Sequence, residues 1–318
     1  MKSAEFLTLV LLFGFACSSS VVQKESSHPQ YDNLGVAKGL KPLSVIGERE
    51  LGTSFLSFPT GISIDILGNI FIADTGNDRV VKCDPQGGFL REIGGFGWEP
   101  GQFNRPTYLT TDNGLNIYVV DTQNKRIQRL DHNLNFVSSV QIEEEGDFTG
   151  IGIPEGIAVN PSGEIILSDL EGDRVIQLDN VFKYERSFGW AGGDLGGLND
   201  PLGVFVDRDG NILVADSHNH RIAIFDQFGN YLESFGEKFL NIPSAVTVGP
   251  DQLIYVANTG KNSITILDPQ GSLILEYGSL GTGMMNLSRP TDVKFGPNGN
   301  LYVVDSGNNR VMVFEIMR

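Results

Sequence analysis

Residues 201–226 read PLGVFVDRDGNILVADSHNHRIAIFD, and this stretch decides the fold because five other segments repeat its pattern. The six copies align without gaps from their first residues, which are Pro59, Pro106, Pro154, Pro201, Pro243 and Pro290. An aspartate stands fifteen residues after five of these prolines, and an arginine follows it by five; the fifth copy has Asn258 and Ser263 instead. Successive prolines are 47, 48, 47, 42 and 47 residues apart, and recurrence at such a spacing indicates a repeat architecture.

Each copy carries the pattern of four short strands. In the first copy, the alternating residues 61–64 precede a glycine turn, and the apolar residues 70–73 follow it. A strand that is apolar on both sides must be buried on both faces. Residues 80–83 and 89–93 are the expected third and fourth strands, joined by a second hairpin turn. Helical periodicity is absent, so we predict an all-β, six-bladed β-propeller of four-stranded antiparallel blades.

The last copy ends after only three strands. Residues 43–47, LSVIG, have the pattern of the missing fourth strand. We expect them to pair with the third strand of the last copy, which closes the ring and covers an exposed sheet edge. The propeller is therefore predicted to span residues 43–318.

The repeated motif resembles a known family. The pattern P-x-G-[IV]-x-[IV], followed by G-N-[IL]-[YFL]-[VI]-[AV]-D-[ST]-x-N-x-R-[IV], is similar to the NHL repeat over about residues 43–316. The resemblance implies a six-bladed propeller of the secreted or lipoprotein bacterial type. NHL propellers include RNA-binding modules, peptidyl-amidoglycolate lyases and sensor domains, so the resemblance says less about activity.

The N-terminus has the composition of an export signal. Lys2 precedes the apolar residues 6–16, a run too short to span a bilayer, which takes about 20 residues. We predict a signal peptide over residues 1–16 and a flexible, Ser-rich tether over residues 17–42. The segment resembles a bacterial lipoprotein signal, which implies lipid on Cys17; plain secretion and no processing remain alternatives. The expected location is the cell envelope (outer membrane or periplasm in a Gram-negative cell), or otherwise the medium.

The charge restricts the partners. With 39 acidic and 23 basic residues, the chain has a net charge of −16, which opposes binding to nucleic acid or to anionic lipid. A lipid anchor is then the one expected route to a membrane, and the propeller is expected to be a monomer. Two cysteines cannot make a disulfide-framed domain. Cys83 takes a position that leucine or phenylalanine fills in the other copies, so it is predicted to be a buried thiol.

The repeated Asp and Arg are predicted to stabilise turns, because a residue needed once for chemistry would not recur in nearly every blade. His218 and His220, two residues apart, are the nearest approach to a metal pair. Zinc catalysis usually needs three protein ligands, so these two histidines are expected to be simply exposed.

The residues directly after the six prolines are expected at the mouth of the central channel. They are Thr60, Thr107, Glu155, Leu202, Ser244 and Thr291. The lyase relatives place metal-binding histidines there, and none of these residues is histidine, which disfavours a zinc lyase. Glu155 is the one charged member. Its alternative role is as a Ca²⁺ ligand, with the hydroxyl groups of the threonines and the serine in this set as further oxygen ligands or supporting groups. No other cofactor is expected.

Long loops are expected on the face that also carries the Asp–Arg turns. Residues 94–105, 143–153, 189–200 and 278–289 form these loops, which carry Phe96, Trp98, Phe103, Phe148 and Trp190. Aromatic residues on the loops of a rigid scaffold are typical recognition residues, although they also serve as plugs over blade junctions. The acidic run 143–147 adds a negative rim.

These observations predict a non-catalytic binding or scaffold propeller for a protein, peptide or glycan partner. Thr60, Thr107, Glu155, Ser244, Thr291, Trp98, Phe103 and Trp190 are its candidate binding residues. The alternative is a secreted propeller enzyme, lactonase-like or lyase-like, with a metal in the central channel. An RNA-binding role is opposed by the charge and by the export signal.

Overall fold

The computed structural model describes residues 37–112, 115–141 and 150–318. The predicted signal peptide, Cys17 and the tether up to residue 36 lie outside the described residues, as do Phe148 and the acidic run 143–147. Within the described ranges, no helix is long and apolar enough to cross a membrane.

The described residues form six four-stranded sheets, which are the blades. Blade 1 contains β2 (Gly61–Ile64), β3 (Ile70–Asp74), β4 (Arg79–Cys83) and β5 (Phe89–Gly94). Blade 2 contains β6 (Pro106–Asp112), β7 (Asn116–Asp121), β8 (Arg126–Asp131) and β9 (Phe136–Gln141). Blade 3 contains β10 (Pro154–Val159), β11 (Ile165–Asp169), β12 (Arg174–Leu178) and β13 (Tyr184–Phe188). Blade 4 contains β14 (Pro201–Val206), β15 (Ile212–Asp216), β16 (Arg221–Phe225) and β17 (Tyr231–Phe235).

Blade 5 contains β18 (Pro243–Val248), β19 (Ile254–Asn258), β20 (Ser263–Leu267) and β21 (Leu273–Tyr277). Blade 6 contains β22 (Pro290–Phe295), β23 (Leu301–Asp305), β24 (Arg310–Met317) and the N-terminal strand β1 (Gly39–Ile46). Between the second and third strands lie four short 3-10 turns, η1 (Thr75–Asn77), η2 (Thr122–Asn124), η3 (Thr259–Lys261) and η4 (Ser306–Asn308).

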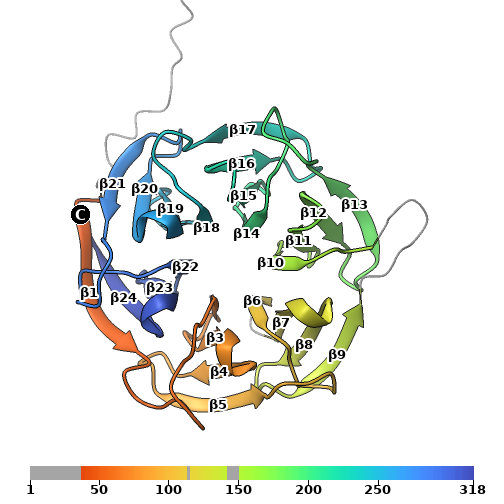
Figure 1. Cartoon of the computed structure of the whole chain (residues 1–318), viewed down its shortest axis with the longest axis vertical. Helices are drawn as coiled ribbons and strands as arrows, with labels where there is room; N and C mark the ends of the chain where they lie inside the picture. Colours follow the sequence, from red (N-terminus) through yellow and green to blue (C-terminus); the bar gives the residue numbers. More distant parts are fainter. Residues whose placement is uncertain (1–36, 113–114, 142–149) are drawn as a thin grey trace, which may run out of the picture. The chain divides into compact units, whose positions relative to one another are not determined.

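The blades surround a central axis. Their first strands lie nearest the centre and their fourth strands lie at the rim, as β6, β10, β14, β18 and β22 show against β9, β13, β17 and β21 (Figure 1). Every pairing inside a blade is antiparallel. The predicted six-bladed, all-β propeller is confirmed.

Apolar burial explains why the blades stand side by side. All five residues of β3, β11, β15, β19 and β23 are buried, as expected for strands covered on both faces by neighbouring blades. The innermost strands approach even more closely. A Cβ on Gly61 would lie 2.4 Å from the carbonyl oxygen of Thr107 in the next blade. The repeated glycine two residues after the proline therefore allows adjacent backbones to touch.

The N-terminal strand closes the ring as predicted. β1 pairs antiparallel with β24, from Gly39 opposite Met317 to Ile46 opposite Val311. The strand begins at residue 39, four residues before the predicted range. The prediction missed residues 39–42 because a bulge between Pro42 and Ser44 interrupts the alternation of the side chains. The bulge leaves Leu43 exposed by 44%, whereas Leu40 is buried, with 2% exposed.

Leu40→Ala is expected to lower the free energy of unfolding by about 2–5 kcal/mol, because it removes a buried side chain from the joint that closes the ring. The matched change Leu43→Ala removes an exposed side chain from the same strand and is expected to cost less than about 0.5 kcal/mol. Urea titration of both variants measures the difference. Equal costs would mean that β1 does not fasten the ring.

Candidate functional site

A buried Asp–Arg pair lies at the end of the second and the start of the third strand in five blades. The arginine Nε lies 2.6–3.0 Å from a carboxylate oxygen in the pairs Arg79–Asp74, Arg126–Asp121, Arg174–Asp169, Arg221–Asp216 and Arg310–Asp305. All five aspartates are fully buried. In blade 5 the amide of Asn258 donates instead to the hydroxyl of Thr265, 3.0 Å away. The predicted structural role of the repeated Asp and Arg is confirmed.

The same pairs hold the long loops. Asp216 accepts a hydrogen bond from the backbone N–H of Asn199 at 2.8 Å, just before the proline of its own blade. Arg221 donates to the carbonyl oxygens of Gly193 at 3.1 Å and Gly197 at 2.6 Å, in the middle of the loop. Arg126 makes the equivalent bond to the carbonyl of Trp98 at 2.7 Å. Each arginine therefore connects the blade core to a loop on one face of the propeller.

The two histidines of blade 4 serve the fold and do not converge on a shared ligand. His220 accepts a hydrogen bond at Nδ1 from the backbone N–H of Ile242 at 3.1 Å, which ties blade 4 to blade 5. His218 pairs through Nδ1 with Asp200 in the preceding loop. In the described part of the chain, no group of three or more His, Cys, Asp or Glu side chains is placed to hold a metal ion.

Cys83 is a buried thiol, as predicted. It is fully covered in the core of blade 1, and burial raises the pKa of its thiol to about 12. A thiol with so high a pKa carries almost no thiolate at neutral pH, so it is not a nucleophile.

The loop aromatics divide into plugs and exposed residues. Phe103 is fully buried and forms a parallel bridge with Phe96; Leu198 and Leu287 occupy the same place in two other loops. The expectation of an exposed Phe103 is therefore wrong, because this side chain folds back over the junction of blades 1 and 2. Trp98 and Trp190 are exposed by 62% and 52%, which agrees with the recognition alternative.

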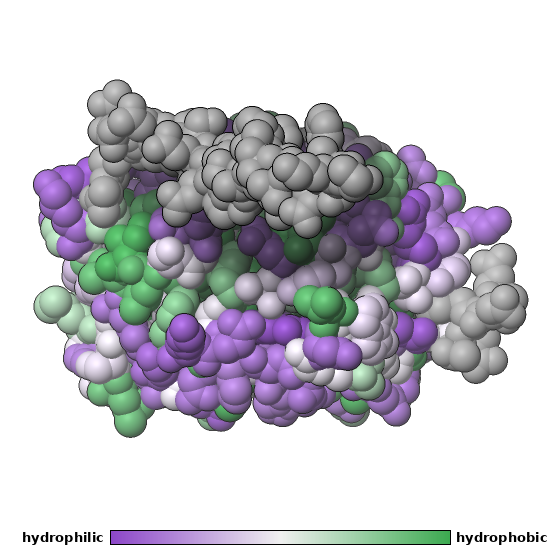
Figure 2. Space-filling view, turned by 90° about the horizontal axis from the view of Figure 1, so that it is seen from above, coloured by the Kyte–Doolittle hydropathy of each residue, from purple (hydrophilic) through white to green (hydrophobic). Residues whose placement is uncertain are grey.

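The exposed large apolar side chains of these loops form what we call the loop face. Its members are Phe55, Phe58, Phe96, Trp98, Trp190, Leu195, Leu280, Met284 and Met285. Sequence reasoning missed Phe55, Phe58 and the aliphatic members. An alignment of residues 94–103, 189–198 and 278–287 places Leu195, Leu280, Met284 and Met285 in the same loops as the aromatic ones. The turns of the opposite face expose Ile66, Leu67, Leu115, Val181 and Phe228, with no tryptophan among the described residues there. Seen edge-on, hydrophobic residues form separate patches within a mainly hydrophilic surface (Figure 2).

The hydroxyls after the prolines join neighbouring blades. Thr60 donates to the carbonyl of Thr107 at 2.8 Å, and Ser244 donates to the carbonyl of Thr291 at 2.8 Å. Thr107 bonds more weakly to the carbonyl of Glu155 at 3.4 Å, and Thr291 lies 3.5 Å from the carbonyl of Pro59. Four predicted channel-mouth residues thus form part of an inner ring of hydrogen bonds.

A tyrosine that sequence reasoning missed crosses the centre of the ring. The hydroxyl of Tyr108 on β6 donates to the carbonyl oxygens of Ser244 at 2.8 Å and Thr291 at 3.1 Å, which belong to blades 5 and 6. The equivalent residue is glycine or alanine in four blades and Asp292 in blade 6, so an alignment of the copies does contain the signal. Burial, and then Asp292 and Glu155, raise the pKa of Tyr108 well above its usual value, which keeps the phenol a donor.

Two buried carboxyl groups lie near this tyrosine. Burial raises the pKa of Glu155 from 4.5 to about 7, against the opposing influence of Arg105 and Thr107. Burial also raises the pKa of Asp292, whose oxygens accept the backbone N–H groups of Ile62 and Val293. The side chains of Thr60, Thr107 and Ser244 are engaged within the fold, and Tyr108 occupies the centre. These residues do not fit a calcium site built on Glu155.

Comparison with known proteins agrees with this architecture. A model of the NHL repeat matches residues 198–225 and 287–314, and no curated protein matches the sequence. A streptogramin B lyase structure is similar with a TM-score of 0.59 and 16% identity, over 88% of this chain and 97% of that chain. A catalytically inactive virginiamycin B lyase from Staphylococcus aureus with quinupristin has a TM-score of 0.60 and 17% identity, with 87% of each chain covered.

A structure of a nidogen/laminin complex is similar with a TM-score of 0.58 and 18% identity, over 70% of this chain and 80% of that chain. At these identities the similarity concerns the fold alone. The matched segments lie in blades 4 and 6, so this chain is a six-bladed β-propeller with NHL repeats in these two blades.

Proposed function

We propose that the propeller is a non-catalytic binding module that holds a protein or peptide partner on its loop face. The observation that carries this proposal is the group of nine exposed large apolar side chains on the loops of one face, which includes both tryptophans of the chain. Tryptophan is enriched at protein–protein interfaces, and it is common among the few residues that contribute most of the binding energy there.

The support of the loops favours binding without rearrangement. Arg126 holds the carbonyl of Trp98, and Arg221 holds the loop that contains Trp190 and Leu195. A surface fixed in this way loses little conformational entropy on binding. With a net charge of −16 on the chain, a neutral or basic partner is favoured over an acidic one.

We also propose that the chain is exported and anchored to the cell envelope by lipid on Cys17. The proposal rests on the apolar residues 6–16 after Lys2 and on the small residues Gly14 and Ala16 before Cys17. Expressed in its source cells, the full chain is expected in the membrane fraction and a Cys17→Ser variant in the soluble fraction. The same distribution for both would remove the anchor from the account.

A second candidate function, an enzyme acting from the channel mouth, is favoured by one observation. Glu155 has a pKa of about 7, and a carboxyl group with such a pKa is suited to general acid–base catalysis near neutral pH. Two of the similar structures are lyases, but their similarity to this chain extends only to the fold. Because Tyr108 fills the centre beside Glu155, we regard this carboxyl as a buried structural acid.

The loop face is tested by affinity capture from the envelope fraction of the source cells. The double variant Trp98→Ser/Trp190→Ser is expected to retain its partner at least about 10-fold less well than the wild type, because hot-spot tryptophans contribute roughly 2 kcal/mol or more. The matched control is Ile66→Ser/Leu67→Ser, which removes two exposed apolar side chains from the opposite face.

The control is expected to capture the same partner as the wild type. Undiminished capture by the tryptophan variant would overturn the assignment of the loop face, and equal loss in both variants would reveal unspecific adhesion of apolar surface. Far-UV circular dichroism and melting curves verify that both variants are folded.

The pKa of Glu155 predicts a pH-dependent cost of folding. Below pH 4.5 the carboxyl is protonated in both states, so it contributes nothing. Between pH 4.5 and about 7 it ionises only in the unfolded chain, so stability falls as the pH rises. Replacement by Gln is therefore expected to stabilise the protein at pH 8 by up to about 3 kcal/mol relative to its effect at pH 4.

Urea unfolding of the wild type and of Glu155→Gln at several pH values measures this difference. A difference that is flat with pH would show that Glu155 is solvated in the folded protein. Stabilisation of the wild type, and not of the variant, by added Ca²⁺ would instead restore the calcium role.

A further inference from the structure

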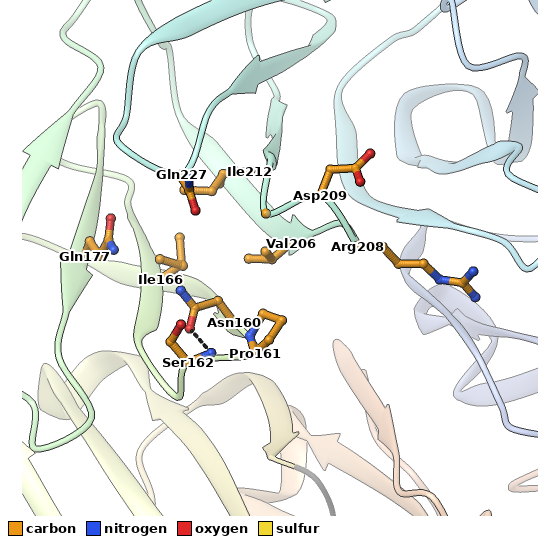
Figure 3. A pocket seen from close by; sticks show the side chains of 11 residues that line it. Asn160, Pro161, Ser162, Ile166, Gln177, Val206, Arg208, Asp209, Ile212 and Gln227 are labelled. Carbon is orange, nitrogen blue, oxygen red and sulfur yellow. Dashed lines mark hydrogen bonds between the residues drawn. The ribbon is translucent and has the colours of Figure 1, made fainter.

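A hollow lies between blades 3 and 4, on the face opposite the loop face. Its volume is about 190 Å³, and its walls come from the first turn of each blade, from β12 and from the second turn of blade 4. Ile166, Val206 and Ile212 form its apolar floor, and the amides of Gln177, Gln227 and Asn160 stand around it (Figure 3).

The hollow lies where two other blade junctions have packed aromatic rings. Twelve residues after the proline, the other copies have Phe71, Tyr118, Leu213, Tyr255 and Tyr302, and blade 3 has Ile166. Tyr118 packs edge-on against Phe182 of the next blade with ring centroids 5.8 Å apart, and Tyr255 packs against Phe295 at 4.9 Å. The positions in blade 4 that correspond to Phe182 and Phe295 are Gly229 and Val206. Small residues thus stand on both sides of this junction where two others have rings.

One polar atom in the wall has no partner. Gln177 is 2% exposed, and its amide nitrogen donates to Glu164 at 3.1 Å. Asn160 donates to the same carboxylate oxygen. The carboxylate thereby fixes the orientation of the Gln177 amide, whose oxygen Oε1 is buried without a hydrogen-bond partner among the described residues. A buried acceptor of this kind is costly unless a ligand or water donates to it.

The equivalent residues of blades 1 and 2 do not leave such an atom. Lys82 donates to the carbonyl of His132 in the next blade at 2.7 Å, and Arg129 donates to the side chain of Asn116 at 2.8 Å. Blade 3 therefore differs from blades 1 and 2 in having an amide with an acceptor oxygen at this position, and that oxygen is unpaired. Two independent features of blade 3, its small side chain and its free amide oxygen, meet in the same hollow.

The chemistry of the walls selects a neutral, hydroxyl-rich ligand. The charged side chains of Arg208 and Asp209 extend away from the floor, so no charged group points inward from them (Figure 3). The volume of about 190 Å³ equals roughly six water molecules at about 30 Å³ each, which suffices for one six-membered ring and lies below the range of pockets for larger ligands. A pyranose ring presents C–H groups to an aliphatic floor and O–H donors to amide oxygens.

We propose that the hollow between blades 3 and 4 binds a single hexopyranose unit, with a sugar hydroxyl donating to Gln177 Oε1 and the C–H face of the ring on Ile166, Val206 and Ile212. This site goes beyond the proposed function, because it lies on the other face of the propeller and shares no residue with the loop face. Either proposal therefore can fail without the other.

The test uses saturation-transfer NMR and calorimetry with glucose, galactose, mannose and N-acetylglucosamine, each as the free sugar and as its methyl glycoside. At least one of them is expected to bind the wild type with a Kd in the millimolar range. Binding of the methyl glycoside identifies the end of a glycan as an acceptable ligand, whereas binding of the free sugar alone identifies a monosaccharide. Both results support the site, and failure of the whole panel overturns it.

Three variants locate the binding. Ile166→Phe puts into blade 3 the ring that blade 1 has at Phe71, so it is expected to fold and to weaken binding more than 10-fold. Gln177→Met keeps the length of the side chain without the amide and is expected to weaken binding at least 5-fold. Leu67→Ala is the control, because this exposed side chain lies on the same face in blade 1 but outside the hollow, and it is expected to bind as the wild type does.

Side-chain amide signals of Gln177 and Gln227 in ¹⁵N-labelled wild type provide a readout that needs no variant. They are expected to shift on addition of the sugar. Sugar binding that leaves these signals unmoved, or that survives in both Ile166→Phe and Gln177→Met, would contradict the proposal.

Discussion

The buried ion pair between aspartate and arginine is the interaction on which this structure depends. Burying a carboxylate and a guanidinium is costly unless both are fully hydrogen bonded. Here the carboxylate accepts one hydrogen bond from the arginine Nε and another from a loop N–H. Asp216, for example, accepts them from Arg221 and Asn199. The outer nitrogens of the arginine then reach the carbonyls of the loop. One pair thus connects the turn between the second and third strands, the core of the blade and the loop above it.

Blade 5, which lacks the charged Asp–Arg pair, indicates what the pair does in the other blades. It has Asn258 and Ser263 in place of the pair, and the loop before its proline is short: 42 residues separate Pro201 from Pro243, against 47 or 48 between the other prolines. Asn258 still accepts the N–H of Asn241 at 2.8 Å, as the aspartates do in their own blades. What blade 5 lacks is the fork of donors that reaches a long loop. The charged pair therefore accompanies the loops that need support, and these loops carry Trp98, Trp190 and Met285.

Most of the fold could be predicted from the sequence, because the six copies share their spacing and each strand has its own apolar pattern. The start of β1 could not, since the bulge after Pro42 breaks the alternation on which the prediction depends. The residues of the candidate site were harder to predict from the sequence. Phe103 and Trp98 lie in one loop, and only the bridge between Phe96 and Phe103 decides which aromatic side chain is buried. Tyr108 and Ile166 were recognisable as departures from the repeat, but their consequences depend on distances between blades that no single copy contains.

The departures from the repeat indicate where function should be sought. Residues that recur in most blades, such as the Asp–Arg pair of five blades and the inner hydroxyls of four, hold the ring together. Tyr108 crosses the centre to blades 5 and 6, and both proposed binding sites accordingly lie on the outer faces. One face has supported loops with exposed tryptophans, and the other has a hollow where blade 3 lacks a ring.

Hydrogen exchange of the loop amides tests the central claim, that the arginines hold the loops, most directly. In the wild type, the amides of Asn104 and Asn199 are bonded to buried aspartates and should exchange slowly although they lie in loops. In Arg221→Lys, which cannot reach two carbonyls at once, residues 189–200 should exchange faster while residues 94–105, held by Arg126, keep their protection. Unchanged exchange over residues 189–200 in this variant would contradict the account.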